Sequence, residues 1–250
     1  MKIAIIAAME REVEPLIRTW GSRLIEHDGR RYRLFESQDG KASLICGGIG
    51  AQAARRATEA VIEAVHPDRV ISAGFAGALD ESAVVGDVIE PRTVINAADG
   101  VRTDTGFGQG ILLTSANTAG KDQKVRLRKA YDANAVDMEA GAVAQGARAR
   151  RIEFGALKTI SDVADFKMPA MESFVASDGS FRAAKFACHV ALRPWLWMTT
   201  IRLARNSSMA STTLSSSIHD YLERETPSAA KSTPDSPALG EFVSFDEDRY

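Results

Sequence analysis

The chain has 250 residues, 45% of them hydrophobic, which is enough to bury the core of one α/β domain. Its formal net charge is −2 with both signs interspersed, and this argues against nucleic acid as the ligand. Cys46 and Cys188 lack paired metal-ligand spacing, and the apolar N-terminal run ends at Glu10, too early for a signal peptide. We therefore expect a cytoplasmic protein.

Short apolar runs alternate with helical patterns along most of the chain. The patterns predict helices after residue 10, over about 51–65, from about 121 and from about 138, and extended segments over 2–7, 32–36, 42–46, 69–73, 88–96, 111–114, 135–136 and 155–160. The polar, glycine-containing segment 97–110 is a candidate lid. Such alternation predicts an α/β fold of three layers with a ligand site at the carboxyl ends of its strands.

The C-terminal part changes character within a few residues. Residues 181–204 carry a helical pattern with aromatic side chains, whereas from Asn206 the composition shifts to Ser, Thr, Pro and Ala without a sustained apolar period. We therefore expect a catalytic domain over 1–205 and a disordered tail over 206–250.

Three carboxylates follow predicted strands: Glu12, Glu139 and Asp162. Taken singly, each is explained as an acid that the helix dipole stabilises at a helix N-terminus. Their convergence at one sheet edge favours a site instead. Cleavage of an N-glycosidic bond develops positive charge on the sugar and negative charge on the leaving base, so it needs carboxylates near the sugar and a proton donor at the base.

Five segments in this order carry a resemblance to a known family: Met1–Glu12, Gly48–Gly50, Ala73–Gly77, Val136–Ala140 and Ile160–Asp165. Together they resemble the methylthioadenosine/S-adenosylhomocysteine nucleosidase group of the nucleoside phosphorylase superfamily. The resemblance implies a nucleoside phosphorylase-like fold, a mixed central sheet flanked by helices. It also implies a purine nucleoside substrate, no cofactor, no metal and a homodimer.

The resemblance also implies roles for individual residues. Glu12 would activate the attacking water, Glu139 would hold a ribose hydroxyl, and Asp162 would protonate N7 of the base. An aspartate suits a 6-amino purine, so adenine is the preferred leaving base. The substrate-binding positions that it further implies are Met9, Ile49, Phe75, Gly77, Met138, Lys158, Ser161 and Phe174.

Several positions bear on the nucleophile and on base stacking. A carboxylate at Glu12 would repel a phosphate dianion, which favours water, and the neighbouring Arg11 is expected to point elsewhere. Phe75 stands where the family usually has a small polar residue. Lys158 stands where an arginine is usual, and lysine lacks the planar fork of arginine. Phe174 and Phe107 are both candidates for the aromatic that stacks on the base.

Alternatives remain open at this level. Ala187–Trp197 resembles a hopanoid-associated branch of the same superfamily, which removes adenine from an adenosyl lipid. Its tryptophans and nearby arginines would suit peripheral contact with a membrane, although a helix packed on the sheet or on a second subunit is the preferred interpretation. A phosphate-dependent purine nucleoside phosphorylase and a non-catalytic nucleoside-binding module are further alternatives. A dinucleotide site, a histidine metal site and a serine nucleophile all lack their required partner residues.

Overall fold

The computed structural model describes residues 1–166, 172–176 and 178–225 of the chain. Its helices are η1 Glu10–Glu12, α1 Glu14–Ile17, α2 Ala51–Val65, α3 Lys121–Tyr131, α4 Ala140–Ala149, η2 Glu172–Phe174, α5 Ala183–Ala191 and α6 Pro194–Glu225. Its strands are β1 Ile3–Ala7, β2 Gly21–His27, β3 Arg30–Glu36, β4 Ala42–Cys46, β5 Arg69–Ala78, β6 Val88–Ile89, β7 Thr93–Asn96, β8 Arg102–Asp104, β9 Ile111–Thr114, β10 Ala135–Asp137 and β11 Glu153–Asp162.

All of these strands belong to one mixed sheet in which β5 is central. Strands β4, β1, β5 and β11 pair in parallel, whereas β2, β3 and β4 form antiparallel pairs at one edge. On the other side, β10 runs antiparallel to the end of β5 and parallel to β9, and β9 pairs in parallel with β7. The predicted α/β fold with a mixed central sheet is confirmed.

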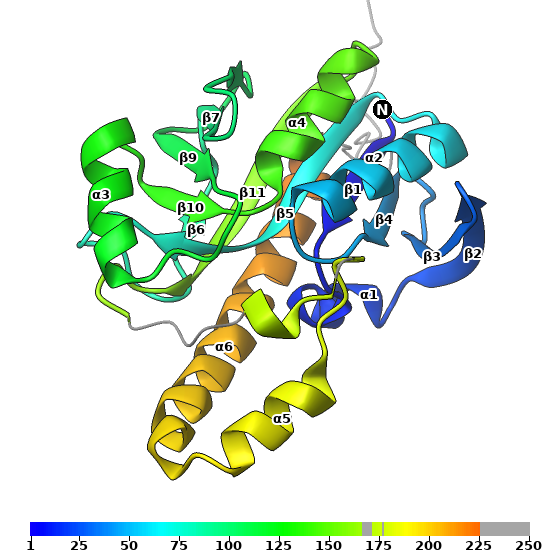
Figure 1. The fold of residues 1–250 in the computed structure, drawn as a ribbon. Helices are drawn as coiled ribbons and strands as arrows, with labels where there is room; N and C mark the ends of the chain where they lie inside the picture. Colours follow the sequence, from blue (N-terminus) through cyan, green and yellow to red (C-terminus); the bar gives the residue numbers. More distant parts are fainter. Residues whose placement is uncertain (167–171, 177, 226–250) are drawn as a thin grey trace, which may run out of the picture.

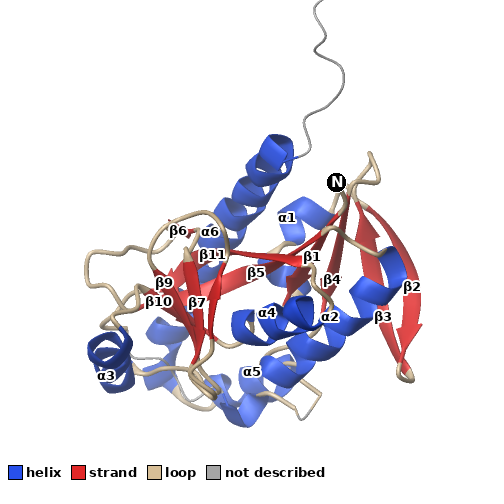
Figure 2. Cartoon of the chain, turned by 90° about the horizontal axis from the view of Figure 1, so that it is seen from above, coloured by secondary structure: helices blue, strands red, loops and turns tan. Residues whose placement is uncertain are grey.

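Helices cover both faces of the sheet (Figures 1 and 2). On one face α2 and α4 pack together through small side chains such as Ala57 and Ala147, both fully buried. On the other face α1 and α6 cover Ile5 and Leu157 of β1 and β11. Because the central strands are buried on both faces, they read in the sequence as continuous apolar runs, as parallel strands commonly do.

Three local predictions need correction. The helix expected after residue 10 is reduced to η1 and the four-residue α1, because strand β2 begins at Gly21. Strand β2 was not predicted, since most of its residues are exposed and it lacks a clean apolar alternation. The segment 97–110 includes β8, which pairs with β7.

The prediction that residues 206–250 form a disordered tail is wrong as far as Glu225. Helix α6 continues to that residue and buries Leu214, Ile218 and Tyr221 against the sheet. These side chains recur at helical spacing, but serines and threonines separate them, so the apolar stripe is narrow. Residues 226–250 lie outside the described part of the chain.

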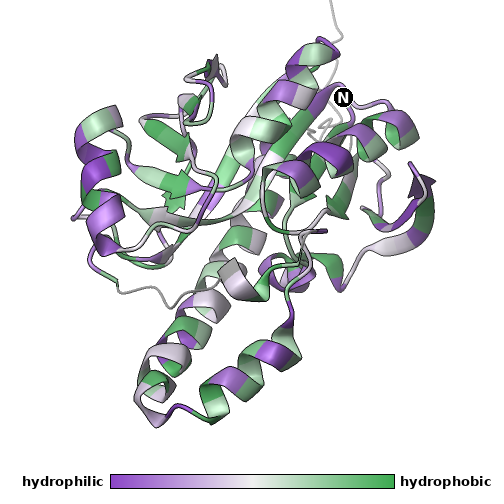
Figure 3. Cartoon of the chain, viewed as in Figure 1, coloured by the Kyte–Doolittle hydropathy of each residue, from purple (hydrophilic) through white to green (hydrophobic). Residues whose placement is uncertain are grey.

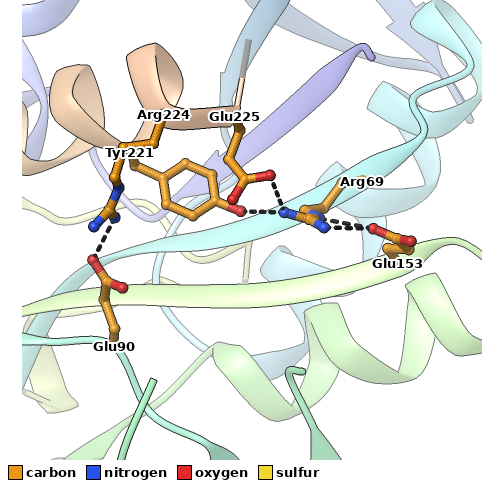
Figure 4. Close-up of polar contacts among 6 residues, drawn as sticks. All are labelled: Arg69, Glu90, Glu153, Tyr221, Arg224 and Glu225. Carbon is orange, nitrogen blue, oxygen red and sulfur yellow. Dashed lines mark hydrogen bonds and ion pairs between the residues drawn. The ribbon is translucent and has the colours of Figure 1, made fainter. Parts of the chain in front are cut away.

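Polar contacts anchor the end of α6 to the sheet, as Figure 4 shows. The guanidinium of Arg69 on β5 donates to Tyr221 Oη at 2.8 Å, to Glu225 Oε2 at 2.8 Å and to Glu153 Oε2 at 2.7 Å. Arg224, the residue before Glu225, donates to Glu90 at 2.8 Å. The C-terminal half of α6 is therefore an integral part of the domain.

Candidate active site

A cavity of about 950 Å³ lies where β1, β5, β10 and β11 end, and α5 and α6 form its far wall. This volume is near the upper end of the roughly 300–1,000 Å³ that small-molecule pockets occupy. A smaller cavity of about 370 Å³ between β7, β8 and α4 contains a single acid, Asp99, among its described lining residues. The larger cavity holds the carboxylates and is the candidate site. Predicted site residues that line it are Met9, Glu12, Ile49, Phe75, Gly77, Met138, Glu139, Ser161 and Asp162.

Glu12 enters the cavity from the short turn η1, and only 4% of it is exposed. Its Oε2 accepts a hydrogen bond from the Ala8 N–H at 3.3 Å. A Cβ atom at Gly74 would lie 3.1 Å from the same oxygen, so the absence of a side chain on β5 makes room for the carboxylate. Burial raises the pKa of Glu12, against the lowering effect of the positive charges on Lys158 and Arg11.

Glu139 sits at the start of α4, where its carboxylate accepts from the Gly50 N–H at 2.8 Å and the Met138 N–H at 3.3 Å. Burial and the neighbouring Asp137 raise its pKa to about 7, although Lys158 acts in the opposite direction. A carboxylate with this pKa changes its charge within the physiological range. The strength with which Glu139 accepts a hydrogen bond therefore depends on pH in this range.

Asp137 also lines the cavity and forms a buried ion pair with Lys158, whose Nζ is 2.9 Å from Asp137 Oδ2. Asp137 also accepts from Thr114 Oγ1 at 2.7 Å and from the Ala140 N–H at 2.8 Å. The net effect of the site is to raise the pKa of Lys158. Burial alone would lower this pKa, but the negative charges of Asp137 and Glu139 outweigh the effect of burial. Lys158 is not among the residues that line the cavity, so it supplies positive charge from behind the site. Sequence reasoning had assigned no role to Asp137.

Asp162 ends β11 and is 3% exposed. Ser161 Oγ donates to its Oδ1 at 2.8 Å, and the Nζ of Lys124 forms an ion pair with its Oδ2. Lys124 also donates to the Val163 carbonyl at 2.8 Å. A Cβ atom at Gly77 would lie 3.0 Å from Asp162 Oδ2 and 3.1 Å from Lys124 Cε, so a side chain here would press on both partners of the ion pair.

Lys124 lines the cavity and was missed by sequence reasoning. It lies in α3 among several other basic residues, and only its 2% exposure distinguishes it from them. Nothing in the local pattern signals that burial, because its partner Asp162 is 38 positions away along the chain.

The aromatic candidates for base stacking are not where they were expected. Phe174 is buried and packs edge-on against Phe186 and His189, with ring centroids 5.2 and 5.1 Å apart. Phe107 packs against Tyr221 at 5.8 Å. Neither is among the described residues that line the cavity. The aromatic lining residues are Phe75, Phe181 and Phe186.

Two other expectations concern the cavity rim. Arg11, expected to point elsewhere, lines the cavity and places its guanidinium 5.4 Å from the ring centroid of Phe181. The candidate lid at 97–110 contributes none of the described lining residues of the large cavity.

One group outside the cavity has the geometry of a metal site. His27, Asp28 and Glu59 each offer a ligand atom within 4.8 Å of the others, where the β2–β3 turn meets α2. His27 Nδ1 already contacts Glu63 Oε2 at 2.9 Å. Exposed acids often gather in this way without an ion, so the expectation that the protein needs no metal stays a prediction.

The mixed sheet and the acid-lined cavity at the strand ends define an α/β protein with a small-molecule site at the edge of its sheet. The sequence model of the phosphorylase superfamily matches residues 2–120 and 111–192. The chain belongs to that superfamily.

Curated relatives agree with this assignment. The 5′-methylthioadenosine/S-adenosylhomocysteine nucleosidase of Glaesserella parasuis is 30% identical over 203 residues, covering 66% of this chain and 87% of the relative. The enzyme of the same name from Staphylococcus aureus is 28% identical over 199 residues, covering 65% and 87%.

Solved structures share the fold. The 5′-methylthioadenosine nucleosidase of Arabidopsis thaliana has a TM-score of 0.69 at 20% identity, covering 91% of this chain and 96% of that one. The futalosine hydrolase of Helicobacter pylori has a TM-score of 0.62 at 16% identity, covering 88% and 98%.

Proposed function

We propose that this protein hydrolyses the N-glycosidic bond of an adenosine-type nucleoside with a 5′ substituent, of the methylthioadenosine or adenosylhomocysteine kind, and releases adenine. The observation that carries the proposal is the convergence of Glu12, Glu139 and Asp162. They come from three separate elements, and each lies in the wall of one cavity. The curated relatives named as nucleosidases for these two substrates support the choice of substrate class.

The proposed reaction uses Glu12 and Glu139 at the sugar. Water bonds to C1′ of the ribose while the bond from C1′ to N9 of adenine breaks, and Glu12 takes the proton that the water loses. Burial raises the pKa of Glu12, which makes its carboxylate a stronger base for this proton transfer. Glu139 accepts a hydrogen bond from a ribose hydroxyl, and its charge stabilises the positive sugar of the transition state.

Asp162 acts at the base by giving a proton to N7 of adenine. When the proton leaves, the carboxylate that remains faces the Lys124 ammonium and the Ser161 hydroxyl. Both interactions are strongest once Asp162 is charged, so they stabilise the state in which the proton has moved. Lys124 is a positioning residue in this scheme.

The far wall bears on the 5′ substituent. Along α5 and α6 the cavity is lined by Phe186, Leu203 and Ala204 together with hydroxyl groups such as those of Thr200 and Ser207. A 5′ substituent directed along this wall would meet both apolar and hydroxyl groups. This lining supports a second candidate function, adenine removal from an adenosyl lipid.

Phosphate remains a rival to water because Arg11 lines the cavity beside Glu12. The proposal favours water, since a buried carboxylate at the nucleophile position repels a phosphate dianion. We further propose that the protein is cytoplasmic and forms a homodimer. Two unpaired cysteines support the reducing location, and the dimer follows from the family resemblance alone.

The test is adenine release, followed by chromatography, from methylthioadenosine, adenosylhomocysteine, adenosine and inosine, each with and without phosphate. We expect adenine release without phosphate, and we expect Asp162→Asn to lower kcat by about 10²- to 10⁴-fold, the usual worth of a general acid. The matched control is Asp165→Asn, an exposed acid of the same segment.

Other outcomes assign other functions. Release that requires phosphate would make the protein a phosphorylase. Tight binding of nucleosides without release would make it a binding module. Release from lipid-substituted adenosine alone would support the second candidate function.

A further inference from the structure

Helix α5 and the first half of α6 form a hairpin that projects beyond the sheet (Figure 1). All residues of α5 are described, and none of them is buried. The hairpin therefore exposes two sides, one toward the cavity and one toward solvent. We call the exposed apolar residues of its outer end the hairpin tip: Leu192, Trp195, Trp197, Met198 and Ile201.

The hairpin tip exposes large apolar side chains in an unusual concentration. Between 49% and 78% of each of the five side chains is exposed to solvent. Exposed apolar residues are normally scattered singly over a protein surface, whereas these five lie within ten positions of each other. On α6 the spacing of Trp195, Met198 and Ile201 places them on one helix face. Figure 3 shows hydrophobic and hydrophilic residues along both helices of the hairpin. Thr200, Leu203 and Ser207 lie on the opposite face and line the cavity.

The charged residues within the hairpin sequence have one sign. From Gly179 to His219 the sequence contains no aspartate or glutamate, whereas the whole chain has a net charge of −2. The basic residues of this stretch are Arg182, Lys185, Arg193, Arg202 and Arg205. Arg202 and Arg205 are exposed, and their spacing puts them on the helix side of Met198 and Ile201. The guanidinium of Arg202 also lies 5.8 Å from the ring centroid of Phe166.

We infer that the hairpin tip is a membrane-surface site that binds the interfacial region of an anionic bilayer. Tryptophan rings favour the headgroup level, and Met198, Leu192 and Ile201 can enter the acyl boundary below it. The arginines then face anionic headgroups, which attract basic residues near the surface. No described helix is long and apolar enough to cross a membrane, and an interfacial site does not need one.

Charge complementarity favours a bilayer over a second copy of this chain. In a two-fold contact the same surface of each copy faces the other, so the two sets of arginines would meet with no acid between them. Burying the apolar residues in such a contact would therefore bring the positively charged arginines of the two copies close together. An anionic lipid surface pairs the same charges instead.

The test is co-sedimentation of the full-length protein with vesicles of phosphatidylcholine, with or without phosphatidylserine. We expect binding to the anionic vesicles that weakens as salt is raised. The chain has three tryptophans, and in the Trp20→Phe variant only the two of the hairpin remain. We expect its emission to shift to the blue when anionic vesicles are added.

Two double variants examine the apolar and the charged contribution. Trp195→Ser with Met198→Ser should lower vesicle partitioning by at least about tenfold, because the buried apolar area is lost. The matched control is Leu24→Ser with Val125→Ser, exposed apolar residues on β2 and α3. Arg202→Glu with Arg205→Glu should lower partitioning by about fivefold or more for each arginine. Its control is Arg126→Glu with Lys129→Glu, also exposed on α3.

Unchanged thermal unfolding midpoints would show that the variants fold. The inference is overturned if the protein binds neither kind of vesicle, or if the control variants lose binding as much as the hairpin variants. A dimer contact at the hairpin tip would also overturn it. In that case light scattering would show a dimer that the double variant Trp195→Ser with Met198→Ser dissociates, and the protein would not bind vesicles. Because vesicle binding is measured without substrate, failure here leaves the proposed function untouched.

Discussion

At the scale of single residues, Glu139 links the stability of the fold to the chemistry of the site. Its pKa is raised from the ordinary value of 4.5 to about 7 because burial and Asp137 disfavour the charged form. The contribution of this group to stability is complete below pH 4.5 and is lost as the pH rises through about 7. Binding should follow the opposite trend, since ionised Glu139 accepts the stronger hydrogen bond from ribose.

We therefore predict that KM for methylthioadenosine falls, and the free energy of unfolding decreases, as pH rises from about 5 to about 8. Kinetics and urea unfolding at a series of pH values measure the two quantities. Glu139→Gln should flatten both profiles over this range. If that variant keeps the wild-type slopes, another group is responsible.

Lys124 gives a second prediction at this scale. Its ammonium contacts Asp162 from α3, and both side chains are almost completely buried. Lys124→Met should lower kcat by about 10- to 100-fold through misplacement of Asp162, with a much smaller change in KM. It should also destabilise the fold by about 1–3 kcal/mol, because the buried carboxyl group of Asp162 loses a hydrogen-bond partner.

Steady-state kinetics below the unfolding midpoint separates the two effects. Lys124→Arg, which keeps the charge, should recover part of kcat, and Lys129→Met on the exposed side of α3 should change neither quantity. A Lys124→Met variant that is less stable but has normal kcat would reduce Lys124 to a structural residue.

At the scale of helices and strands, the sequence predicted best those elements whose side chains are mostly buried. Strands β4 and β9 have the predicted bounds because each is a short apolar run flanked by turn residues. Helix α6 was truncated in the prediction because its buried stripe of Leu214, Ile218 and Tyr221 is narrow and lies among serines and threonines. Only the sheet that receives this stripe reveals it as core.

Leu214→Ala tests whether α6 belongs to the folded domain. Leu214 is fully buried in the apolar cluster that also contains Leu157 of β11, so its truncation should lower the free energy of unfolding by about 2–5 kcal/mol. Met209→Ala, on the same helix but 50% exposed, should change it by less than about 0.5 kcal/mol. Urea unfolding measures both. Equal stability of Leu214→Ala and wild type would contradict the packing of α6.

At the scale of the whole molecule, the cavity joins segments from both ends of the chain. Glu12 comes from near the N-terminus, Glu139 and Asp162 from the middle, and Phe186 and Leu203 from the C-terminal hairpin. A ligand in the cavity therefore binds the hairpin to the sheet. Opening of the hairpin and ligand binding should be mutually exclusive.

We predict that trypsin cleaves the native protein early after Arg182 and Lys185, which are exposed at a helix without buried residues. A non-hydrolysable adenosine analogue at about 100 times its Kd should slow this cleavage by about 100-fold, since it stabilises the closed form by about 2.7 kcal/mol. Mass spectrometry identifies the fragments. Cleavage at Arg30 and Arg31, in the β2–β3 hairpin outside the cavity, is the internal control. Equal slowing at both places would argue against local protection.

The sequence by itself determined the order of the buried strands and the three carboxylates that follow them. Both are local properties, because an apolar run and the polar residue at its end lie within a few positions of each other. Only the tertiary structure decided that Lys124 faces Asp162, that Phe181 and Phe186 line the cavity in place of Phe174, and that α6 closes the domain. These depend on contacts between residues far apart in the chain, and no local pattern encodes which distant partner a side chain will meet.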